Sequence, residues 1–150
     1  MSLEQKINDD IKAAMLARES QKLEALRAVK AALLLEKSKE GATGEVTEEA
    51  ELKILQKLVK QRRESADIYS QAGRQDLSTK EIFEASVIET YLPKQLTEAE
   101  VTEIIRGIVA RTGASSIKDM GKVMGAASAE LAGKADNKMI SGIVKGLLSN

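Results

Sequence analysis

This chain of 150 residues has no histidine and no cysteine, and it has very few aromatic side chains. The absence of thiols and imidazoles excludes disulfides, His- or Cys-ligated metal sites and every catalytic triad that needs histidine. Its three rings, Tyr69, Phe83 and Tyr91, are too few for a platform that stacks single-stranded bases. We therefore expect no catalytic residue, no metal and no cofactor.

Neither sign of charge dominates, because 23 Lys and Arg side chains balance 23 Asp and Glu side chains. This balance excludes a strongly basic nucleic-acid clamp that spans the whole chain, and we expect no DNA partner. The longest strongly apolar stretch, Ala31–Leu35, is far shorter than a membrane span, and the polar start is unlike a signal peptide. We expect a cytoplasmic protein without a membrane partner.

Glycine and proline are unevenly placed along the chain. The single proline is Pro93, and seven of the ten glycines lie at Gly107 or beyond. Apolar residues recur at helical spacing, and no stretch alternates as a half-buried strand does. The sequence predicts an all-α fold in which a larger N-terminal helical domain, residues 1–92, is followed by a small three-helix C-terminal domain, residues 93–150.

Local start and stop signals divide both halves into helices. Capping side chains are expected at Ser20, Thr47, Ser78 (paired with Glu81), Thr97 (paired with Glu100), Ser116 (paired with Asp119) and Asp136. Stops are expected at Gly41–Gly44, Gly73, Gly113 and Gly133. The paired acids Asp9–Asp10 and Glu48–Glu49 are interpreted as partners of helix dipoles at helix starts and on polar faces.

The C-terminal half is mildly cationic, since residues 104–150 hold seven basic and three acidic side chains. Within it, Gly121 and Gly125 lie four apart in a predicted helix, where each costs about 1 kcal/mol relative to alanine. Two explanations are open: close packing of another helix, or close approach of an RNA backbone with Lys118 and Lys122 reaching its phosphates.

The segment Gly133–Lys138 is a tight turn into the last helix. It is either purely structural or an anion site in which Lys134 and Lys138 flank a helix N-terminus. The candidate RNA contacts are therefore Lys118, Gly121, Lys122, Gly125, Gly133, Lys134 and Lys138.

A second basic face lies in the third predicted helix. Its residues are Lys53, Lys57, Lys60, Arg62 and Arg63. A solvated helix face and a second RNA contact both fit this pattern. Ser115 and Ser116, close to Lys118, are interpreted as capping residues and not as a Ser–Lys nucleophile pair.

An ordered set of segments makes the chain resemble the YqeY family over almost its whole length. These segments are Leu26–Arg27, Val59–Ser65, Gly73–Leu77, Lys80–Glu81, Tyr91–Leu96, Met120–Gly125 and Gly133–Asp136. That family is similar to the C-terminal tail of GatB, a subunit of the glutamine-dependent Asp/Glu-tRNA amidotransferase, in which the helical tail contacts tRNA. The resemblance implies an all-helical fold, a connection to tRNA, and proteins of translation or aminoacyl-tRNA amidation as partners.

Three hypotheses for function follow. The first is a non-catalytic, tRNA-associated accessory protein. The second is a carbon–nitrogen ligase with glutamine as amido-nitrogen donor, a label attached to relatives, although the chain is too short to include the catalytic cradle domain of GatB. The third is a helical protein–protein adaptor that docks through the second basic face or the glycine-bearing helix.

Overall fold

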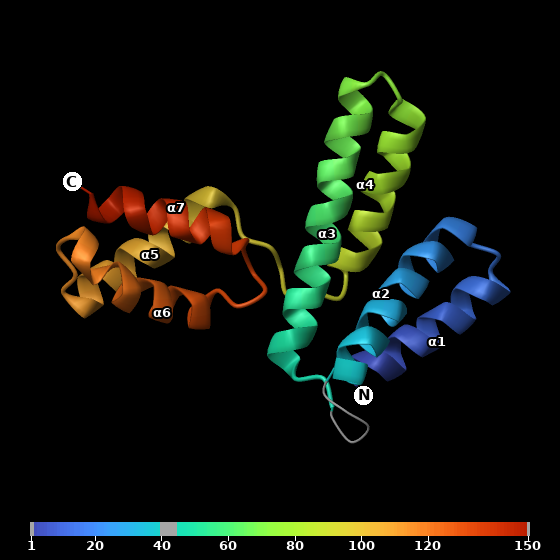
Figure 1. The fold of residues 1–150 in the computed structure, drawn as a ribbon, viewed down its shortest axis with the longest axis horizontal. Coiled ribbons are helices and arrows are strands. Elements are labelled where there is room, and N and C mark those ends of the chain that lie inside the picture. Colours follow the sequence, from blue (N-terminus) through green and yellow to red (C-terminus); the bar gives the residue numbers. More distant parts are fainter. Residues whose placement is uncertain (1, 40–44, 150) are drawn as a thin grey trace. The chain divides into compact units, whose positions relative to one another are not determined.

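The computed structural model describes residues 2–39 and 45–149, and every regular element within those ranges is helical (Figure 1). The all-α prediction is therefore confirmed. The elements are α1 Leu3–Leu16, α2 Ser20–Lys39, α3 Glu48–Gln71, α4 Gln75–Glu89, α5 Glu98–Thr112, the short 3-10 helix η1 Ile117–Asp119, α6 Met120–Glu130 and α7 Asn137–Leu148. The stop predicted at Gly41–Gly44 lies outside the described residues.

By its internal contacts the chain divides into an N-terminal unit, Met1–Leu92, and a C-terminal unit, Pro93–Asn150. In the N-terminal unit, α1 packs along α2, α3 packs along α4, and α2 also contacts α4 (Figure 1). Their inward faces meet in one apolar cluster, whose largest fully buried side chains are Ile7, Leu26, Leu55 and Ile88. None of the helices in the described ranges has the length and apolarity of a membrane span.

The turn between α3 and α4 follows the predicted stop. Gly73 has a φ of 76°, a left-handed conformation that glycine adopts without the strain of a Cβ. At the other end of α3, Thr47 accepts a hydrogen bond from the Ala50 N–H at 3.1 Å, as predicted. Glu48 and Glu49 lie in the first turn, where their charges suit the helix dipole.

Two predicted caps are wrong. Helix α2 begins at Ser20 itself, so this residue lies inside the helix and does not cap it. Helix α4 begins at Gln75, three residues before Ser78. The Ser78 side chain is buried and donates its hydroxyl to the Ala66 carbonyl of α3 at 2.9 Å. The serine thus joins two helices. It does not cap α4, because the short turn at Gly73 starts this helix earlier than the pattern indicates.

Asp10 also differs from its predicted role. It lies in the middle of α1, away from the helix start, and accepts a hydrogen bond from the Tyr91 hydroxyl. Burial, together with this bond to Asp10, raises the pKa of Tyr91. The Lys6 ammonium lies 5.4 Å from the centre of the same ring. Tyr91 therefore ties the first helix to the end of the N-terminal unit.

A nearly buried ion pair links α3 to α4. Arg62 Nε lies 3.9 Å from Glu84 Oε1, and the two side chains are only 17% and 11% exposed. Arg62 Nη1 donates to the Leu58 carbonyl, but Nε is buried without a hydrogen-bond partner. Burial raises the pKa of Glu84, Arg62 opposes this shift, and the nearby acids Glu81 and Glu24 add to it.

The C-terminal unit packs α5, α6 and α7 around a second apolar cluster that includes Ile105, Ile108, Val123, Ile140 and Val144. Several of its predicted signals are confirmed. Thr97 and Glu100 form a reciprocal capping box, Gly113 ends α5 with a φ of 70°, and Asp136 caps α7. Ser116 and Asp119 also form a capping box, but it opens η1, and α6 follows from Met120.

The raised pKa of Glu84 generates a prediction about pH and stability. A group whose pKa is higher in the folded state stabilises the fold at low pH, and this contribution is lost as pH rises through the folded pKa. We expect the free energy of unfolding of the wild type, relative to Glu84→Gln, to fall as pH rises from about 4 to 7. Urea unfolding across this range measures it, with the exposed Glu64→Gln as control for the loss of one charge. A difference that increases with pH would contradict the assignment.

Candidate nucleic-acid interface

Most side chains of the second basic face interact with other residues of the N-terminal unit. Lys53 forms an ion pair with Glu49 at 3.3 Å, and Arg63 donates two hydrogen bonds to Glu89 Oε1 at 2.6 and 3.1 Å. Arg62 is the nearly buried partner of Glu84. On this face, the two arginines hold α3 against α4, and Lys57 and Lys60 are exposed.

The two glycines of α6 face open space. A Cβ added to Gly121 or to Gly125 would meet no other atom within 4 Å. The hypothesis that another helix packs closely on these glycines is therefore wrong for the described chain. The cost of about 1 kcal/mol for each glycine in a helix is not offset by packing against any other described residue.

Sequence reasoning missed a second pair of this kind. Gly142 and Gly146 lie four apart in α7, and a Cβ at either would also meet nothing within 4 Å. The signal was present in the sequence, since both pairs have the same spacing within predicted helices. Gly107 in α5 is equally open but has no glycine partner one turn away.

The four predicted RNA-contacting lysines are all exposed, but they differ in their contacts. Lys122 donates to the Thr112 carbonyl at the end of α5 at 3.0 Å. Lys118, Lys134 and Lys138 make no ion pair with any residue in the described part of the chain. Three cationic side chains thus remain available to an anionic partner.

The acids of the same region are already engaged. Glu130 forms an ion pair with Arg111 at 2.5 Å, and Asp136 accepts the Lys138 N–H at 3.1 Å. Asp119 accepts the N–H groups of Ser115 and Ser116 at 2.9 and 3.4 Å. These two bonds hold the pKa of Asp119 below its usual value. Ser116 is the N-cap residue of η1, and Asp119 is its capping-box partner.

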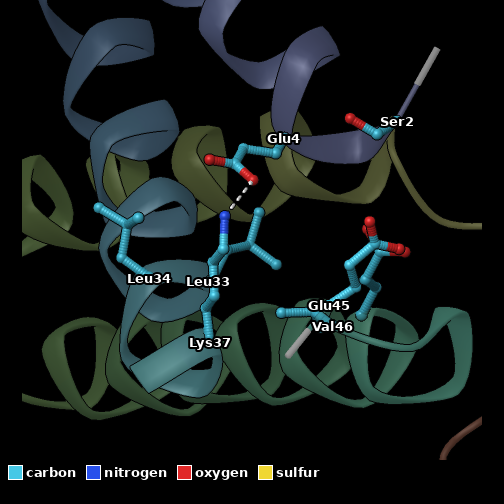
Figure 2. Close-up of a pocket in the computed structure, with 8 residues that line it drawn as sticks. Ser2, Glu4, Leu33, Leu34, Lys37, Glu45 and Val46 are labelled. Atoms are coloured by element: carbon cyan, nitrogen blue, oxygen red, sulfur yellow. Dashed lines mark ion pairs between the residues drawn. The ribbon is translucent and has the colours of Figure 1, made fainter. Parts of the chain in front are cut away.

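A hollow of about 190 Å³ lies elsewhere, in the N-terminal unit, where α1 begins and α2 ends (Figure 2). Glu4 and Lys37 form an ion pair of 3.7 Å across it, and Leu33, Leu34 and Val46 contribute apolar surface. None of the predicted site residues lines this hollow. Across the described ranges, no group of three Asp or Glu side chains is arranged to hold a metal ion.

Comparison with known families gives a match over most of the chain. The model of the family described as Yqey-like protein matches residues 4–148, nearly the whole chain. The chain belongs to the YqeY family. No curated protein matches it.

Two of the segments that carry the YqeY resemblance contact each other. Gln95, in Tyr91–Leu96, donates from Nε2 to the Gly133 carbonyl at 2.6 Å and to the Pro93 carbonyl at 2.8 Å. The Leu96 N–H donates to the Lys134 carbonyl at 2.9 Å. Gly133 is buried and has a φ of 73°. This geometry favours the structural explanation for Gly133, while Lys134 and Lys138 point their exposed side chains to solvent.

The contribution of the Gln95 hydrogen bonds to stability can be tested by Gln95→Ala. Loss of the two side-chain hydrogen bonds should lower the free energy of unfolding by about 1 kcal/mol, measured by urea denaturation. The matched control is Gln21→Ala, at an exposed position of α2, which should change stability by less than about 0.5 kcal/mol. A Gln95→Ala protein as stable as the wild type would show that these hydrogen bonds contribute nothing to the stability of the fold.

Proposed function

We propose that this YqeY-family protein is a non-catalytic, tRNA-associated accessory protein that acts with the cytoplasmic translation machinery. In this proposal, residues 1–92 form the larger helical domain, and residues 93–150 form a smaller domain that contacts tRNA. The family membership supports the proposal, because the YqeY family resembles the tRNA-contacting tail of GatB.

The observation that carries the proposal is the contrast in charge pairing between the second basic face of α3 and the C-terminal unit. On α3, both arginines and Lys53 have acidic partners. On the C-terminal unit, Lys118, Lys134 and Lys138 have no ionic partner among the described residues, and the neighbouring acids are used in caps or in an ion pair. Unpaired surface lysines are what a phosphate backbone requires.

Such a surface would position RNA without reading its sequence. Lysine contacts to phosphates fix orientation, whereas sequence is read at base edges. The exposed Gly121 and Gly125 of α6 would let the RNA backbone approach the helix more closely than a side chain would permit. Recognition of tRNA would then depend on its folded shape, or on an enzyme that binds the same tRNA.

Filter binding with purified tRNA tests this proposal. We expect a dissociation constant below about 100 μM at low salt, and a log–log salt slope of roughly −2 to −3 if three lysines contact phosphates. Replacement of Lys118, Lys134 and Lys138 by glutamine should remove most of this slope. The same replacement at Lys53, Lys57 and Lys60 is the matched control and should leave most of the affinity.

Other outcomes would point to the other hypotheses. No salt-sensitive affinity below this limit would overturn RNA binding. Recovery of translation proteins on the immobilised chain after RNase treatment would then favour the adaptor. Glutamine-dependent conversion of Glu-tRNA by the purified chain would favour a carbon–nitrogen ligase.

A further inference from the structure

The outward face of α7 is built from small and basic residues, whereas its inward face is apolar. Ile140, Val144 and Leu148 are buried in the apolar cluster of the C-terminal unit. The exposed residues on the opposite side of the helix are Lys138, Gly142, Lys145, Gly146 and Ser149. This set is called the α7 face. It contains only lysine, glycine and serine.

The α7 face is cationic, and the helix that carries it supplies no acidic side chain. The helix Asn137–Leu148 contains no acidic residue. Lys138 and Lys145 are seven residues apart, two turns of the helix, so their backbones are about 10 Å apart along its axis. Neither lysine makes an ion pair with another residue in the ranges that the structure describes. The charge of this face is complementary to a polyanion.

Two glycines leave the helix backbone of the α7 face uncovered: Gly142 lies between the two lysines, and Gly146 directly follows Lys145. Both have ordinary helical backbones, so no turn requires glycine there. Apart from the backbone of the helix itself and the neighbouring residues, no atom of the described chain lies within 4 Å of the position that a Cβ would occupy. A partner from outside could therefore come within contact distance of the helix backbone while both lysines reach its charges.

The chemistry of the C-terminal unit also limits the kind of polyanion. Residues 93–150 include no phenylalanine, tyrosine or tryptophan. Proteins that bind single-stranded nucleic acid depend on such rings to stack unpaired bases. Double-stranded RNA is recognised mainly through its phosphates and 2′-hydroxyl groups, for which lysine, serine and exposed backbone suffice.

We propose that the α7 face docks on the backbone of a double-stranded segment of RNA, independently of its sequence. This inference rests on the proposed function and adds to it Lys145, Gly142 and Gly146 of α7, together with the class of RNA structure that the helix contacts. Lys138 and Lys145 contact phosphates, and the two glycines bring the helix backbone against the groove edge.

The test uses the full chain and a fluorescent RNA hairpin, with a single strand of equal length as competitor. Gly142→Gln and Gly146→Gln together should weaken hairpin binding at least tenfold and raise the melting temperature, because glutamine is a better helix former than glycine. The control is Gly107→Gln in α5, which also projects into open space. It should raise the melting temperature without changing affinity. Lys145→Gln should reduce the magnitude of the salt slope by about 1.

Each remaining outcome overturns a stated part of the inference. Unchanged affinity in the α7 glutamine variant would exclude the α7 face and leave tRNA association intact. Equal or tighter binding of the single strand would exclude double-stranded RNA as the preferred class. Wild-type protein that binds neither RNA would overturn both this inference and the proposed function.

Discussion

Burial of apolar side chains in two separate clusters is the constraint on which the structure depends. Ile7, Leu26 and Ile88 belong to one cluster, and Ile105 and Ile140 belong to the other. Each helix must turn one face inward to build its cluster, and this fixes which side chains remain outside. The chain has no histidine or cysteine, and those outer faces present charge, hydroxyl groups, exposed backbone and some large apolar side chains such as Leu16 and Ile68.

The two units use their surface charges differently. In the N-terminal unit, ion pairs cross between helices, as Arg63–Glu89 and Lys80–Glu24 do, and Arg62–Glu84 is nearly buried. Such pairs specify how the helices are arranged, although exposed ones contribute little stability. In the C-terminal unit, acids cap helices and several lysines are left without counter-charge. With more basic than acidic side chains, the C-terminal unit therefore presents a cationic surface, whereas ion pairs in the N-terminal unit join its helices.

The C-terminal unit also carries helical glycines that weaken its helices without helping its packing. Four of them form the two pairs in α6 and α7. The second apolar cluster and the hydrogen bonds of Gln95 to the turn at Gly133 hold the unit together despite this cost. A stability loss that no internal contact offsets is common at surfaces that meet a partner, because selection there acts on binding as well as on folding.

Sequence alone determined the features that depend on neighbouring residues in the chain. The helical class, the caps at Thr47 and Thr97 and the stop at Gly73 follow from spacing and from hydrogen bonds over three or four residues. Only the tertiary structure decided the features that depend on distant atoms. Ser78 matched a capping box but bonds to Ala66 across the hairpin, and open space beside the α6 glycines excluded packing as their explanation. A local sequence pattern indicates which polar groups need hydrogen-bond partners. The packing of the helices determines which partners these groups reach.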